Sequence, residues 1–194
     1  MAVHAISTVL STTKSYFSLL SPTENNFVTG NVSALRLRSF DYSLQSIPTR
    51  KNVSFGLSDT EFSNVKYLNS GSSSVVYTGL KEDKVFVVKM LKPTSKYSKI
   101  AVEEMHIEML ILSRVVHENI ITIYGAGEIS RKFIMLEYLG GGTLEHQLHA
   151  HQRSGNHAGL PWETVLPIIM DLAAALKYLN EDFHPLAMII HRGT

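Results

Sequence analysis

The stretch "SSVVYTGLKEDKVFVVKML", residues 73–91, decides the fold. Two runs rich in β-branched residues flank a polar segment between Gly79 and Lys84, a pattern that predicts a β-hairpin. Just upstream, "FSNVKYLNSG" (62–71) alternates apolar and polar residues until it meets Gly71. That alternation predicts another strand, so the ordered part of the chain begins with three successive strands.

A helix is predicted after the hairpin. Apolar residues between Ile100 and Val116 recur at three- and four-residue steps, as on one face of an amphipathic helix. Two further strands are then predicted over "NIITIYGAGE" (119–128) and "KFIMLEYL" (132–139), with a turn near Ser130. The order predicts an α+β fold, in which one helix packs on a five-stranded antiparallel sheet.

Two more helices are expected beyond "GGG" at 140–142. Thr143 is a candidate N-cap for a short helix through Leu148. A longer helix runs from about Pro161 to Leu179, and Pro167 should kink its early turns. The apolar face of this helix needs partners from another part of the protein.

The composition is that of an ordinary globular protein. The 194 residues are 44% hydrophobic and 18% charged, with a formal net charge of +1, so no broad nucleic-acid-binding or membrane-binding surface is predicted. The absence of cysteine excludes disulfides and thiolate metal sites. No stretch reaches the ~18 apolar residues of a membrane span. A group of histidines between His146 and His157 is interpreted as a solvated loop, because suitably spaced acidic or cysteine ligands are missing.

Residues 1–57 show no sustained strand or helix period, and we predict an irregular, Ser/Thr-rich extension. Lys14 is the only fixed positive charge before the first acid, Glu24. The many Ser and Thr residues and the lack of acids are typical of a transit peptide, but such peptides are usually rich in Arg. A weakly structured leader is therefore favoured, and a transit peptide stays an alternative. We favour a cytoplasmic location.

Taken together, residues 57 to 192 resemble a eukaryotic protein kinase domain, from its start to just inside its second lobe. The resemblance rests on several motifs in the family's order, and it leans towards the receptor-like and tyrosine-kinase-like branches. It implies three parts, which are an extension at 1–57, an N-lobe at 58–139, and the first helices of a C-lobe at 140–194.

The first motif, "LNSGSSSVVYTG" (68–79), is similar to the glycine-rich loop that covers ATP. Only the middle glycine of the family pattern is kept, as Gly71. Asn69 and Ser74 stand at the other two glycine positions, and Val76 stands at the valine position. The resemblance implies nucleotide contacts from the following residues: Leu68, Gly71, Ser72, Ser73 and Val76.

The second and third motifs supply a charge pair. "VFVVKM" (85–90) fits the family's V-A-I-K strand and places Lys89 where the family's lysine binds the α- and β-phosphates. Phe86 and Val87 replace the usual Val and Ala, and Val87 lies at the roof of the implied adenine pocket. Counting back nine residues from His117 gives Glu108, the match for the family's helix glutamate that pairs with that lysine.

The fourth motif, "FIMLEYLGGGTL" (133–144), looks like the hinge between the two lobes. Leu136 would stand behind the adenine as gatekeeper. The backbone carbonyl of Glu137 and the backbone amide of Leu139 would hydrogen-bond the purine edge.

The chain finishes on "AMIIHRGT" (187–194), whose His191 and Arg192 resemble the start of the catalytic motif H-R-D-x-x-x-x-N. Gly193 occupies the position of the catalytic aspartate, and no metal ligand is predicted. We expect this sequence to be the N-terminal portion of a kinase, as a truncated gene model, a fragment or a genuine short isoform.

Two functions follow. The first is an ATP-dependent protein kinase acting on serine or threonine, less readily on tyrosine, that uses ATP and Mg²⁺ in its complete form and is inactive as this chain alone. The second is a non-catalytic interaction module resembling a pseudokinase. Expected partners are ATP, a protein substrate, and the C-lobe or partner that would cover the last helix.

Overall fold

The computed structural model describes residues 16–20, 47–50, 52–57, 62–93, 98–128, 131–153, 160–183 and 188–192. The strands are β1 (Tyr16–Leu20), β2 (Ser54–Leu57), β3 (Ser63–Ser70), β4 (Ser74–Lys81), β5 (Lys84–Leu91), β6 (Ile123–Glu128), β7 (Lys132–Glu137) and β8 (Met188–Arg192). The helices are α3 (Ser98–Leu112), α4 (Leu144–Arg153), α5 (Trp162–Lys177) and the π-helical turn η2 (Tyr178–Asp182).

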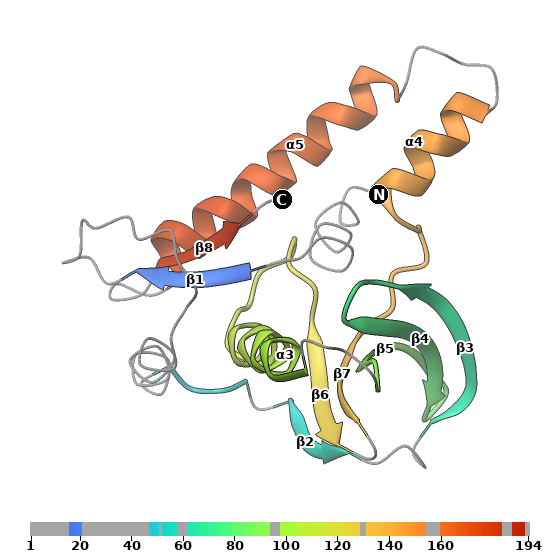
Figure 1. Ribbon diagram of the computed structural model, residues 1–194. Helices are drawn as coiled ribbons and strands as arrows, with labels where there is room; N and C mark the ends of the chain where they lie inside the picture. Colours follow the sequence, from blue (N-terminus) through green and yellow to red (C-terminus); the bar gives the residue numbers. More distant parts are fainter. Residues whose placement is uncertain are drawn as a thin grey trace.

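The central feature is a six-stranded sheet in the order β2-β6-β7-β5-β4-β3 (Figure 1). The five strands from β3 to β7 pair antiparallel, as predicted, and α3 packs on the sheet. The α+β fold class with a kinase-like N-lobe and the beginning of a helical C-lobe is therefore confirmed.

The sixth strand, β2, comes from the segment that was predicted to be irregular. It pairs parallel to β6, with Ser54 opposite Gly125 and Leu57 opposite Gly127. Leu57 is 7% exposed and packs with Phe86 and Phe133. Four residues are too short a run to show a period, so only the pairing with β6 identifies this strand.

A second, two-stranded sheet joins β1 to β8, with Tyr16 opposite Arg192 and Phe17 opposite His191. It lies apart from the six-stranded sheet (Figure 1). This pairing also places strand structure inside the predicted irregular extension. The residues likened to the start of a catalytic loop, up to Arg192, are strand residues here, and Gly193 lies outside the described residues.

The main core lies between α3 and one face of the sheet. Its most buried large side chains are Ile111, Leu112, Ile123 and Ile134, each at most 2% exposed. The helix ends at Leu112, earlier than predicted, because the chain turns at Ser113 and Arg114.

After this turn the two adjacent valines point in different directions. Val115 enters the core at 3% exposure, whereas Val116, predicted on the apolar face of the helix, is 64% exposed. The i, i+4 spacing from Leu112 to Val116 matched the helical pattern, but the pattern has no physical meaning once the helix has ended.

Helix α4 begins as predicted and continues past Leu148 to Arg153. The hydroxyl of Thr143 accepts a hydrogen bond from the His146 N–H at 3.0 Å, which is the N-cap interaction expected of threonine. Helix α5 runs without a break through Pro167, and the kink stays a prediction.

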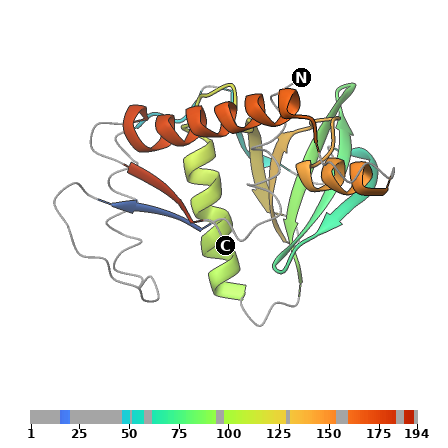
Figure 2. The same ribbon diagram turned by 90° about the horizontal axis from the view of Figure 1, so that it is seen from above.

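Helix α5 crosses one end of α3 (Figure 2). The six-stranded sheet lies on one side of α3, and β1 and β8 lie on its other side. Its inner side contributes Leu172 and Ala175 to the main core, and Leu179 of η2 follows. On its outer side Leu166, Ile169, Met170 and Leu176 are exposed. The predicted apolar face is thus divided, since its members Leu172 and Leu179 pack in the core of this chain, and the need for an outside partner stays a prediction.

Polar contacts fix α5 to the loop after α3. Tyr178 Oη accepts a hydrogen bond from the Val116 N–H (3.2 Å), and its ring lies 5.0 Å from that of His117. Asn119, buried at 6%, donates from its side-chain amide to the Asp171 carbonyl at 3.3 Å. These bonds hold α5 and η2 against the loop that follows α3.

We predict that Gly127→Ala destabilises the fold. A Cβ at this position would overlap the Leu57 carbonyl and lie 2.6 Å from Cζ of Phe133, so β2 or the Phe133 ring must shift. The free energy of unfolding should fall by roughly 1–3 kcal/mol, measured by urea denaturation. Gly140→Ala is the matched control because its Cβ would meet nothing closer than 3.8 Å. Equal stability of the two variants would contradict the close packing of β2 on β6.

Candidate functional site

The centre of the site is an ion pair between β5 and α3. Lys89 Nζ lies 2.7 Å from Oε2 and 2.9 Å from Oε1 of Glu108, so one ammonium contacts both carboxylate oxygens. The two side chains are only 14% and 11% exposed. The structure therefore brings together the two residues that the sequence paired across 19 positions.

Two different periodicities produce this contact. Alternate residues of a strand share a face, so Lys89 points to the α3 side together with Val87, while Val88 packs in the smaller core on the opposite face. On the helix, residues three or four apart share a face, and Glu108 lies in line with the buried Met105 and Leu112. A strand face and a helix face thus meet at this pair.

A tight turn between β3 and β4 lies at one end of the same sheet. The Gly71 N–H donates to the Ser74 carbonyl at 2.9 Å and closes the turn. Gly71 and Ser72 are exposed, Ser73 is half-buried, and Ser74 is 7% exposed. The turn thus offers an accessible backbone at the place predicted for a phosphate-binding loop.

Val76 links this turn to the ion pair. It is the ladder partner of Lys89, and directly opposed residues of neighbouring strands lie on one face. Strand β3, on the other side of the turn, pairs less regularly with β4. Its register shifts between Tyr67 and Asn69, and the exposed Leu68 lies between them. Val76 therefore lies on the same face of the sheet as Lys89. Leu68 has no ladder partner in β4, so the strand pairing does not show which face its side chain is on.

Across the sheet, β7 provides the opposite wall. Leu136, 3% exposed, is the ladder partner of Val87, so both lie on the face that carries Lys89. Glu137 ends the strand and is half-buried; its N–H donates to the Thr122 carbonyl at 2.9 Å, and its Oε2 accepts from the Thr122 N–H at 3.3 Å. The half-buried Leu139 follows in the link to α4.

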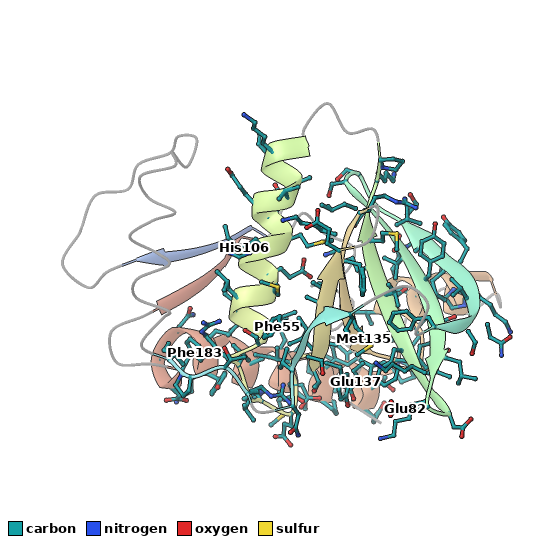
Figure 3. All side chains as sticks on the ribbon, turned by 90° about the horizontal axis from the view of Figure 1, so that it is seen from below. Phe55, Glu82, His106, Met135, Glu137 and Phe183 are labelled. Atoms are coloured by element: carbon teal, nitrogen blue, oxygen red, sulfur yellow. The ribbon has the colours of Figure 1, made fainter. Side chains whose placement is uncertain are left out.

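Figure 3 shows Met135 and Glu137 along β7, with Glu82 at the turn of the neighbouring hairpin. Met135 packs in the smaller core with Val88, on the face opposite to Leu136. The bonds of Glu137 to Thr122 fix the point at which β7 leaves the sheet.

The structure also contains a cavity of about 270 Å³. Its walls come from β2, α3 and the β6–β7 hairpin, and include Phe55, Met105, Met109 and Phe133. His106 stands on the helix at its edge (Figure 3). None of the predicted nucleotide-binding residues lines this cavity, although Ile134, the ladder partner of Lys89, does.

Within the described ranges, no group of three or more His, Cys, Asp or Glu side chains is arranged to hold a metal ion. His146 and His149 lie on α4, where His149 Nε2 is 3.9 Å from Glu145 Oε1, and His157 lies outside the described residues. Among all the residues that the structure describes, no helix is long and apolar enough to cross a membrane.

Sequence reasoning missed one residue near the site, Lys92. Its Nζ donates to the Gly71 carbonyl at 2.5 Å. A lysine three residues after Lys89 is visible in the sequence, but the pairing of β4 with β5 is needed to place it beside the turn.

The chain is similar in sequence to known protein kinases. A family model described as protein tyrosine and serine/threonine kinase matches residues 62–193. Similar proteins include a proline-rich receptor-like protein kinase, PERK12, from Arabidopsis thaliana, 35% identical over 136 residues. Cysteine-rich receptor-like protein kinase 6 from Oryza sativa subsp. japonica is 26% identical over 173 residues. A third, named "Probable LRR receptor-like serine/threonine-protein kinase", from Arabidopsis thaliana, is 33% identical over 129 residues.

These alignments cover 68%, 88% and 66% of this chain. They cover 17%, 23% and 13% of the three relatives, so the chain spans less than a quarter of the length of each. The matched family model, by contrast, extends over more than half of the chain and includes the ion pair, the turn and the hinge segment. The chain therefore belongs to the family of protein tyrosine and serine/threonine kinases.

Proposed function

We propose that this chain binds ATP between the turn at Gly71, the Lys89–Glu108 pair and the segment after β7, as the nucleotide-binding part of a protein kinase. The observation that carries the proposal is the bidentate contact of Lys89 with Glu108 at 2.7 and 2.9 Å. A lysine held in this way presents a fixed positive charge, which suits the phosphates of a nucleotide.

The turn fits a phosphate group on a separate ground. A Cβ added at Gly71 would meet only Ser74 atoms at 3.9 Å, which is ordinary contact, and its φ is not positive. Folding therefore does not require glycine here. Close approach of a ligand to the backbone would require glycine at this position, because a Cβ would occupy the space next to the N–H groups.

The purine would lie against Val87, with Leu136 behind it; these two residues are ladder partners on the face of Lys89. Apolar walls with a few backbone donors and acceptors are typical of sites for flat ligands. We assign the hydrogen bonds to the purine edge to the Glu137 carbonyl and the Leu139 N–H. Neither depends on a side chain.

In this arrangement Lys89 binds the α- and β-phosphates, and Glu108 keeps its ammonium in place. ATP with Mg²⁺ supplies the transferable phosphoryl group in kinases. Within the described residues, no group of three side chains is arranged to hold a metal ion. We therefore assign no residue of this chain as a ligand of Mg²⁺. The activity proposed for the complete kinase is phosphorylation of protein serine or threonine. The name of one relative states this activity for that protein.

A second candidate is a non-catalytic interaction module. It is favoured by Gly193, which stands where the family's H-R-D motif has its aspartate. Without a carboxylate at that position, no side chain there accepts the proton of the substrate hydroxyl. A folded chain that binds no ATP would support this candidate over the first.

We predict that Lys89→Met lowers ATP affinity by at least about tenfold, because a charge-assisted bond to the phosphates is lost. Isothermal titration calorimetry measures the affinity, with Lys99→Met, on the exposed side of α3, as control. The same change leaves the Glu108 carboxylate without its cation. The free energy of unfolding should therefore fall by up to about 3–5 kcal/mol, and titrations are best done at a temperature where both variants are folded. If Lys89→Met bound ATP as tightly as the unmodified chain does, the proposed site would be contradicted.

Gly71→Ala separates binding from folding. The melting temperature should stay within about 1 °C of the unmodified chain, since the new Cβ meets no atom closer than 3.9 Å. ATP affinity should fall roughly tenfold through loss of backbone contacts to phosphate. If stability fell and ATP affinity did not, glycine would be required by the fold and the phosphate contact would be refuted.

Phosphoryl transfer is tested by incubating the chain with γ-labelled ATP and mixed peptides that contain serine, threonine and tyrosine. Because Gly193 offers no proton acceptor, we expect no more label in peptide than with Lys89→Met. Transfer clearly above that background would show that another group does the work assigned to the missing aspartate.

A further inference from the structure

Lys92 contacts the turn at Gly71 in two ways. Its backbone N–H donates to the Ser73 carbonyl at 2.9 Å, one step beyond the last ladder pair of β4 and β5, Ser74 with Leu91. Its side-chain Nζ donates to the Gly71 carbonyl at 2.5 Å. One residue at the end of β5 thus holds two carbonyls of the turn between β3 and β4.

These bonds complement the closure of the turn itself. The Gly71 N–H is used internally, on the Ser74 carbonyl at 2.9 Å, and Lys92 occupies the carbonyl of the same glycine. Gly71 therefore has both its backbone groups bonded, although it is exposed. An exposed turn held only by its own short bond would fray more readily.

The fixed turn matters because of where it lies. Backbone N–H groups bind a phosphate best when they need not be ordered at the moment of binding, since that ordering weakens the affinity. The ammonium of Lys92 sits on the carbonyl of Gly71, so it fixes the turn without occupying the N–H groups of Ser72 or Ser73. The bond is charge-assisted, but the exposure of Gly71 keeps its effect modest.

We propose that Lys92 is a positioning residue that holds the turn of residues 71–74 in its phosphate-binding form before the nucleotide arrives. The inference rests on the proposed function, and it adds a residue that binds neither purine nor phosphate in this arrangement. It predicts an effect on phosphate-bearing ligands and none on the nucleoside.

The test uses the full chain with Lys92→Met, which keeps the length of the side chain and removes the donor, and Lys92→Arg, which restores a donor. Lys84→Met is the matched control, since Lys84 is an exposed lysine at the other end of the hairpin. Binding of ATP, ADP and adenosine is measured by calorimetry. We expect Lys92→Met to weaken ATP and ADP about three- to tenfold, to leave adenosine unchanged, and to be largely rescued by Lys92→Arg.

Hydrogen–deuterium exchange of the ligand-free chain gives the second readout. Amides of residues 71–74 should exchange about three- to tenfold faster in Lys92→Met than in Lys84→Met. Weaker ATP binding with unchanged exchange would overturn the positioning role in favour of direct contact with phosphate. Unchanged exchange with unchanged binding, or an equal loss of adenosine binding, would also overturn it.

The two proposals can fail separately. If the unmodified chain binds no ATP, the proposed function is contradicted, and the exchange result alone still decides whether Lys92 holds the turn. If ATP binding is lost in Lys89→Met and unaffected in Lys92→Met, the site stands and the role of Lys92 is refuted.

Discussion

The ion pair between Lys89 and Glu108 joins the two elements on which the rest of the structure is arranged. It bridges β5, inside the sheet, and the C-terminal part of the packed helix α3, with both side chains largely withdrawn from water. Taking two charges out of water is costly, and the contact offsets that cost only while both partners stay in register. The pair therefore ties the rotation of α3 to the register of β5, and it fixes a positive charge on the face where the proposed nucleotide site lies.

Two apolar cores make this register unambiguous. Val88 and Phe86 pack on one face of the sheet with Leu57 of β2, and alternate residues of β5 pack on the other face with α3. A shift by one residue would exchange the two faces and carry Lys89 away from the helix. The position of the charge is thus set by apolar packing on both sides of the strand.

Residues 47–50 and 52–57 contribute more to the packing of the sheet and α3 than their composition suggested. Arg50 donates its backbone N–H to the Ser113 carbonyl at 2.9 Å, and Arg114 Nε donates to the Ile47 carbonyl at 3.0 Å. Together with β2, these bonds fasten the preceding segment to the end of α3 and to β6. The predicted boundary at residue 58 stays a prediction, but the chain before it shares contacts with the sheet and the helix.

The sequence alone determined the five antiparallel strands and the packed helix, because strong periodicity is a local record of which face is buried. The pairing of Lys89 with Glu108 was an expectation from the resemblance of two motifs to the kinase family. The sequence also placed Gly71 in a turn and Thr143 at a helix start. Strand β2, the end of α3 before Val116 and the contact of Lys92 with the turn were decided only by the tertiary structure. Each depends on which segments meet in space, and a short run or a single lysine has the same local pattern whether or not a partner lies beside it.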